Sequence, residues 1–153
     1  MRHIKPFEDF IKDGVIKRIS VNRDRAKSLI SESERKMRSV KLQLEKIGIN
    51  EDNANDYVEH CFDSLMNLIR AKLYLNGYYA SGQGAHEAEV SYLRELDFTE
   101  KDIQFADQLR YFRNGILYYG TALDKEYANK VFAYTKKIHS KLRELLKREL
   151  YDK

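Results

Sequence analysis

The position of the single proline, Pro6, is the feature of this chain that most restricts its fold. Proline breaks a helix when it falls in the interior. With one proline near the start of 153 residues, almost the whole length is free to be helical. No segment shows the clear apolar and polar alternation of a half-buried strand. We therefore predict an all-α fold, an antiparallel bundle of about five to six helices.

Apolar spacing and capping residues locate the helices. The spacing of Val58, Phe62, Leu65 and Ile69 is 4, 3, 4, which places them on one helical face. Thr99, with Asp102 three residues later, predicts a capped helix start. The predicted segments are approximately 7–19, 23–47, 54–75, 85–96, 99–120 and 124–150.

Charge divides the chain near residue 50. Residues 1–50 carry 13 Lys and Arg against 7 Asp and Glu, and residues 51–153 carry 15 against 17. The composition of the loop around 48–56 also differs from its surroundings. We predict a helical N-terminal extension over 1–50, packed on a bundle over 51–153. A second basic run lies at 136–148. Both runs are interpreted either as solvated helix surface or as a face that meets phosphates.

Composition also bears on cellular setting and cofactors. A lone cysteine, Cys61, excludes an internal disulfide and fits a reducing compartment. No apolar run approaches bilayer length, and the N-terminus lacks the apolar stretch of a signal peptide. We expect a cytoplasmic protein that makes no membrane contact. The histidines do not pair at metal-ligand spacing, so we expect neither a metal nor a cofactor.

Two stretches are candidate sites. "SGQGAHE" (81–87) contains glycines before a helix, which predicts either a plain connector or exposed N–H groups that suit an anion. "FRNGILYYG" (112–120) places Arg113, Asn114, Tyr118 and Tyr119 close together. Periodicity favours a packed helix in which Arg113 pairs with a carboxylate and the tyrosines fill core. Gly115 leaves room for a helix break that would create a pocket.

The run from Glu100 to Leu146, "EKDIQFADQLRYFRNGILYYGTALDKEYANKVFAYTKKIHSKLRELL", resembles the C-terminal half of HEPN domains, the higher eukaryote and prokaryote nucleotide-binding family. The preceding "LMNLIRAKLYLNGYYASGQGAHEAEVSYLREL" resembles the first half. There the glycines and His86 resemble the family loop G-x(4)-G-x(2)-H. The resemblance covers roughly residues 52–150. It implies a small all-α domain that forms a homodimer.

The resemblance also implies site residues. Many HEPN proteins carry an R-x(4–6)-H motif, and the ribonucleases among them cleave RNA without metal through attack of the ribose 2′-OH. Arg113 and Asn114 match the start of that motif. Tyr118 or Tyr119 stands in the histidine slot, and 114–138 holds no histidine. Because tyrosine is a poor proton shuttle near neutral pH, we name no catalytic residue. The nucleotide- or RNA-binding candidates are therefore Arg113, Asn114, Tyr118, Tyr119 and His86.

Three functional hypotheses follow. The first is a non-catalytic HEPN-like protein that binds a nucleotide or RNA, as the partner subunit of a minimal nucleotidyltransferase of toxin–antitoxin type. The second is a metal-independent HEPN ribonuclease with a rebuilt site, in which His86 or Tyr118 handles the proton. The third is a helical protein-interaction module that works through its basic N-terminal arm.

Overall fold

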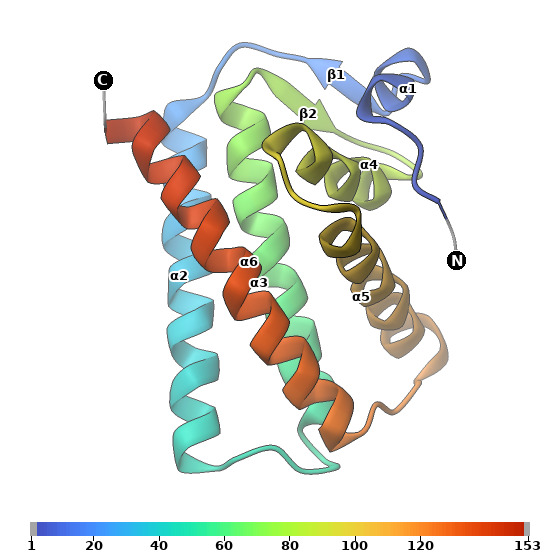
Figure 1. Ribbon diagram of the computed structural model, residues 1–153, viewed down its shortest axis with the longest axis vertical. Helices are drawn as coiled ribbons and strands as arrows, with labels where there is room; N and C mark the ends of the chain where they lie inside the picture. The colour runs from blue at the N-terminus through green and yellow to red at the C-terminus, as the bar shows by residue number, and fades with distance from the viewer. Residues whose placement is uncertain (1–2, 152–153) are drawn as a thin grey trace.

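The computed structural model describes residues 3–151, apart from the side chains of residues 117 and 118. The described chain forms six α-helices and a two-stranded sheet (Figure 1). The elements are α1 (Phe7–Lys12), β1 (Ile16–Arg18), α2 (Arg23–Lys46), α3 (Ala54–Leu75), β2 (Tyr78–Ala80), α4 (Ala85–Ser91), the 3-10 helix η1 (Tyr92–Leu96), α5 (Glu100–Tyr119) and α6 (Lys125–Tyr151). The prediction of a helical bundle is confirmed at this level, and the small sheet is an addition that was not predicted.

The core lies around α3, which is buried along most of its length. In Figure 1, α2 lies on one side of α3 and α5 on the other, and α6 crosses diagonally in front of α3. The hydrophobic core is continuous. Residues 3–50 contribute Ile4, Phe7, Phe10, Ile16, Ala26, Leu29, Ile30, Val40 and Ile49 to the same cluster as α3. The basic first third of the sequence is therefore packed against the rest of the bundle.

The prediction of one helix over 7–19 is wrong beyond Lys12. Gly14 adopts a positive φ of 79°, and residues 16–18 then pair antiparallel with residues 78–80. Each strand has three residues, which is too short to show a period of two. The two backbones come close together next to the strand pair, where the amide of Ile19 donates to the carbonyl of Gly77 at 2.8 Å. This contact fixes which segments pair. A Cβ at Gly77 would lie 2.9 Å from the Ile19 carbonyl oxygen, so glycine is needed there.

The helix that carries the candidate motif, α5, is unbroken. Thr99 and Asp102 form the reciprocal capping box that the sequence predicts. Gly115 does not break the helix. A Cβ at Gly115 would lie 3.2 Å from Oγ1 of Thr121, where the chain folds back and the Thr121 amide donates to the Gly115 carbonyl. Gly115 therefore makes room for the connection to α6 and creates no pocket.

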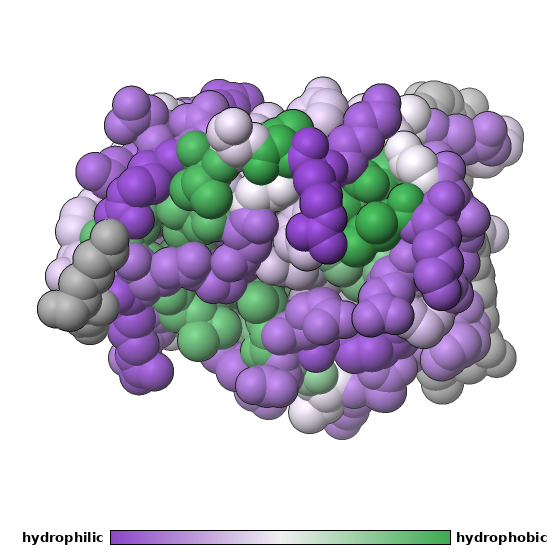
Figure 2. All heavy atoms as spheres, turned by 90° about the horizontal axis from the view of Figure 1, so that it is seen from above, coloured by the Kyte–Doolittle hydropathy of each residue, from purple (hydrophilic) through white to green (hydrophobic). Residues whose placement is uncertain are grey.

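Apolar side chains reach the surface at the end of the molecule that carries the sheet. Figure 2 views this end from above and shows hydrophobic areas separated by hydrophilic side chains. Three large hydrophobic residues of β2 and of the segment between β1 and α2 are exposed, namely Ile19, Val21 and Tyr79. The same end also holds α4, the N-terminal turn of α2 and the last turn of α3. The surface of this end of the molecule therefore borders the site described next.

Candidate functional site

A stripe of polar residues runs along α3, a helix that is otherwise mostly buried. Asp63, Asn67, Arg70 and Tyr74 are spaced 4, 3, 4, so they share one face of the helix. We call them the α3 stripe. Polar groups on a core helix need partners or an opening to solvent, since an unpaired buried polar group is costly. The α3 stripe has both partners and an opening to solvent. Asp63 lies against cations of α2 and α5, whereas Arg70 lies against α4 and is partly exposed.

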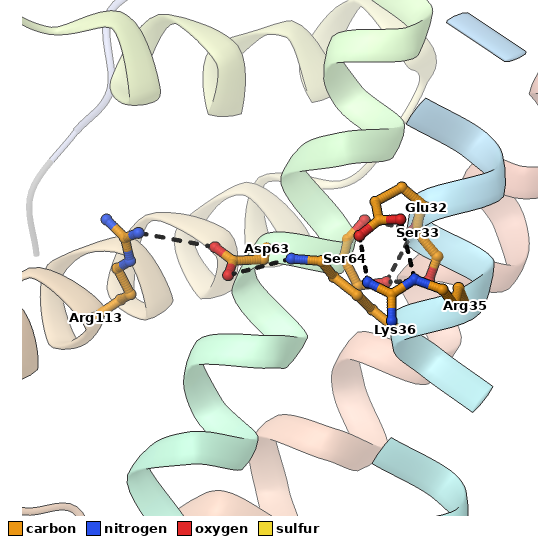
Figure 3. A network of polar contacts seen from close by, with 7 residues as sticks. All are labelled: Glu32, Ser33, Arg35, Lys36, Asp63, Ser64 and Arg113. Carbon is orange, nitrogen blue, oxygen red and sulfur yellow. Dashed lines mark hydrogen bonds and ion pairs between the residues drawn. The ribbon is translucent and has the colours of Figure 1, made fainter. Parts of the chain in front are cut away.

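At the lower end of the stripe, Asp63 lies between two cations (Figure 3). Its carboxylate is 3.8 Å from Nη2 of Arg113 on α5 and 3.6 Å from Nζ of Lys36 on α2. The guanidinium of Arg113 also lies 5.2 Å from the centre of the Phe62 ring, and its Nε is buried without a hydrogen-bond partner in the described chain. The prediction that Arg113 pairs with a carboxylate is thus the arrangement observed.

Two turns further along the stripe, Arg70 meets a buried carboxylate on α4. Nε of Arg70 donates to Oε2 of Glu89 at 2.6 Å, and Nη2 donates to Oε1 at 3.3 Å. The Glu89 side chain is 5% exposed, whereas Arg70 is 31% exposed. The pair therefore places a carboxylate inside the protein and leaves part of the guanidinium at the surface. Such a two-point contact fixes the plane of the arginine.

His86 completes the cluster. Its Nδ1 lies 2.9 Å from Oε1 of Glu89 and 3.2 Å from Nη2 of Arg70. The shorter contact, to a buried carboxylate that needs donors, assigns the proton to Nδ1. Nε2 is then an acceptor without a partner in residues 3–151. A histidine oriented by a carboxylate in this way can accept a proton or a hydrogen bond from a ligand.

The cluster forms one wall of a pocket of about 340 Å³, which we call the Arg70 pocket. The volume falls at the lower end of the roughly 300–1,000 Å³ typical of small-molecule sites. Asn67 is 8% exposed, and its amide has no hydrogen-bond partner in the described part of the chain. Four elements line the pocket, through Arg25, Leu29, Asn67, Arg70, Leu73, Tyr74, Tyr78, Tyr79, Ala80, Ala85, His86 and Glu89.

The outer part of the pocket is aromatic and basic. Tyr74 and Tyr79 have ring centroids 6.2 Å apart at a tilt of 43°, and Tyr79 is 44% exposed. Arg25 lies on the exposed side of the first turn of α2, and its guanidinium has no ion-pair partner among the residues described. The pocket thus offers cationic donors beside aromatic surfaces, which is the combination that binds a phosphate together with a flat ring.

The predicted site residues fall into three groups. His86 lines the Arg70 pocket, whereas Arg113 does not; both contact Phe62, and the His86 ring centroid is 6.0 Å from that of Phe62. Asn114 is half-buried on α5 and lines none of the pockets described here, while Tyr119 is 85% exposed. Tyr119 does not fill core, contrary to the periodicity argument. The side chain of Tyr118 lies outside the described residues.

Sequence reasoning missed the residues that build the pocket, above all Arg70, Glu89 and Asn67. A signal was present in the sequence. The 4, 3, 4 spacing of the α3 stripe parallels the apolar spacing that was used to locate the helix, and four polar residues in register on a core helix are unusual. The partner pair His86 and Glu89 sits at i, i+3, which also places both side chains on one face.

Within residues 3–151, no group of three or more His, Cys, Asp or Glu side chains is arranged to hold a metal ion. In the same part of the chain, no helix combines the length and the apolar character needed to cross a bilayer. No family model, curated protein or solved structure matches this chain.

Proposed function

We propose that this protein binds a nucleotide, free or as a unit of RNA, in the Arg70 pocket. The observation that carries the proposal is the convergence of Arg25, Arg70 and His86 with the tyrosines on one opening. The phosphate would lie against the free edge of the Arg70 guanidinium and against Arg25. The base would stack on Tyr79, which is exposed and backed by Tyr74. The amide of Asn67 would supply a hydrogen bond from the pocket floor.

The charges in the pocket favour selective binding of moderate affinity over tight binding of any anion. Glu89 already neutralises part of the charge of Arg70, so an incoming phosphate would meet a net charge set mainly by Arg25. Shape and stacking would then contribute as much as charge. This supports a nucleotide as the ligand in preference to inorganic phosphate, which has no ring to stack.

The test is calorimetric titration with adenosine and uridine 5′-monophosphates. Arg25→Ala is the primary variant, because Arg25 is exposed and unpaired and its loss leaves the fold intact. We expect Arg25→Ala and Arg70→Ala each to weaken binding at least fivefold. Arg35→Ala is the matched control on the same helix, since Arg35 is exposed and forms an ion pair with Glu32 away from the pocket. Unchanged binding by both pocket variants would refute the proposal.

A second candidate function, metal-independent RNA cleavage, is favoured by the contact between His86 and Glu89. In this reaction the ribose 2′-OH attacks the adjacent phosphorus, the 5′-oxygen leaves, and a 2′,3′-cyclic phosphate and a 5′-hydroxyl end are formed. Nε2 of His86 would accept the 2′-OH proton, Arg70 would stabilise the phosphorane, and the leaving 5′-oxygen would take its proton from water. Incubation of a uridine-rich RNA in EDTA tests it. Cleavage lost in His86→Ala supports it, and intact RNA rejects it.

We also propose the HEPN assignment, with the homodimer and the nucleotidyltransferase partner that it implies. These proposals rest on the resemblance over residues 52–150 and on the arginine–asparagine pair at 113–114. Arg113 and His86 both contact the ring of Phe62, at 5.2 Å and 6.0 Å from its centre. Light scattering of the purified chain tests the dimer directly, because a monomeric mass at micromolar concentration would contradict it.

A further inference from the structure

The fold brings together the two basic runs of the sequence. Helices α2 and α6 run alongside each other in opposite directions (Figure 1). Between them lies a pocket of about 250 Å³, which we call the basic groove. One wall carries Arg38 and Lys41 from α2, and the other carries Lys136 and Arg143 from α6. Residues almost a hundred positions apart thus present four exposed cations to one opening.

Acidic side chains leave most of this charge uncompensated. Glu34 is the carboxylate that lines the groove, and it lies 3.3 Å from Arg143 and 3.7 Å from Lys147. Within residues 3–151, Arg38, Lys41 and Lys136 have no carboxylate partner within ion-pair distance. Like charges held this close repel one another, so an incoming anion is attracted by several cations at once.

A rigid polar network forms the floor. His139 is 7% exposed, and its Nε2 lies 2.9 Å from Oγ of Ser33. Oγ of Ser33 donates to the carbonyl of Ser64 at 2.6 Å, so the serine oxygen accepts from the histidine. Burial lowers the pKa of His139 to about 4; the nearby Glu34 carboxylate opposes this shift, and Lys41 and Arg143 add to it. The floor is therefore neutral at physiological pH and does not offset the cations above it.

We propose that the basic groove binds the phosphate backbone of a nucleic acid. Backbone binding needs a row of exposed lysines and arginines and little else. An acidic protein surface is the less suitable partner, because stable protein interfaces are anchored by apolar or aromatic residues. Apart from Met37, which is buried, the lining of the groove is charged or polar.

The groove is separate from the Arg70 pocket, and this inference does not depend on the proposed function. Arg25, which lines that pocket, lies roughly 140–160° around α2 from Arg38 and Lys41 at 100° per residue. A nucleic acid held in the groove would therefore lie on a different flank of α2. Because the contacts would be to phosphates alone, the groove would hold single-stranded RNA and DNA of the same length with similar affinity.

The test is fluorescence anisotropy with labelled 20-nucleotide RNA and DNA at several salt concentrations. The variant is Arg38→Glu with Lys41→Glu. The control is Lys17→Glu with Lys125→Glu, which changes the net charge equally at two exposed positions outside the groove. We expect the groove variant to weaken binding at least tenfold at low salt and to reduce the salt slope by about 2. The control should stay within twofold.

Three results would overturn the inference. Equal losses in the groove variant and the control would mean general charge attraction. Unchanged binding in the groove variant would place the nucleic acid elsewhere. Tighter binding of a labelled polyglutamate than of RNA, lost in the same variant, would identify an acidic protein as the partner. Mononucleotide titration of the groove variant separates the two proposals, since it should match the wild type if the Arg70 pocket acts independently.

Discussion

The Arg70 pocket and the basic groove lie on opposite flanks of α2. They differ in whether their charged side chains are paired with buried partners or are exposed and unpaired. In the pocket, Arg70 and His86 are bound to a carboxylate that is 5% exposed. In the groove, three of the four cations have no carboxylate partner in the described chain, and all four are exposed. A buried charge that is paired holds its partners in fixed positions, so the stability of the fold depends on the pair. Unpaired, exposed charge adds long-range attraction and contributes little to the fold.

The largest expected effect is on the Arg70–Glu89 pair. Arg70→Ala should lower the free energy of unfolding by about 3 kcal/mol, because it leaves the Glu89 carboxylate buried without its main partner. Glu89→Ala should cost less, since Arg70 is 31% exposed and can turn toward water. Urea denaturation of both variants measures the difference. A larger loss in Glu89→Ala would contradict this assignment of the buried charge.

The floor of the groove should make stability depend on pH. The folded-state pKa of His139, about 4, lies below its ordinary value of 6.5. The unfolded chain therefore binds more protons between these values, so stability is complete above about pH 6.5 and falls as the pH drops toward 4. The expected loss is roughly 3 kcal/mol. His139→Gln should flatten the curve in that window; a variant curve that parallels the wild type would exclude this origin.

The serine network beneath the groove should contribute less. Ser33→Ala removes the acceptor for His139 and a donor to the Ser64 carbonyl. The expected cost is about 1–2 kcal/mol, because buried polar groups lose their partners. Ser39→Ala is the matched control on α2, since the Ser39 hydroxyl accepts a part-buried hydrogen bond from the side chain of Gln43. Thermal denaturation compares them, and equal shifts in the two variants would argue against a structural role for the network.

The smallest expected effect is on the groove cations themselves. Arg38→Glu with Lys41→Glu should change the free energy of unfolding by less than about 0.5 kcal/mol, because the side chains are exposed and unpaired. At low salt the change should be slightly stabilising, since repulsion across the groove is relieved. If the free energy of unfolding measured in urea fell by more than about 1 kcal/mol, these residues would support the fold. The two flanks of α2 would then not differ as described.

The sequence predicted the long helices well, for physical reasons that are local. The bounds of α3 match its prediction, and the cap at Thr99 is where the residues indicated it. The strand pair was missed because it depends on contacts between segments about sixty residues apart and on the close approach at Gly77. Local propensity at Val15 and Ile16 could not show which partner would pair with them.

The candidate site was predicted only in part. His86 was chosen because of the glycine loop, and it does line a pocket. Arg113 was chosen from a motif, and in the structure it pairs with Asp63 and does not line that pocket. Glu89 is the carboxylate that contacts His86. A glutamate three residues after a histidine on a helix is an ordinary spacing. The i, i+3 spacing places Glu89 on the same helical face as His86, but its burial against Arg70 depends on how α3 and α4 pack and has no signal in the sequence.

The most direct test of the central claim is an NMR titration of the labelled protein with adenosine 5′-monophosphate. The account predicts saturable shifts of the Asn67 side-chain amide and of the His86 ring, with little change at Asn114. It also predicts that Arg25→Ala removes most of the response at the same ligand concentration. No saturable shift at Asn67 and His86, or shifts confined to residues 113–120, would contradict nucleotide binding in the Arg70 pocket.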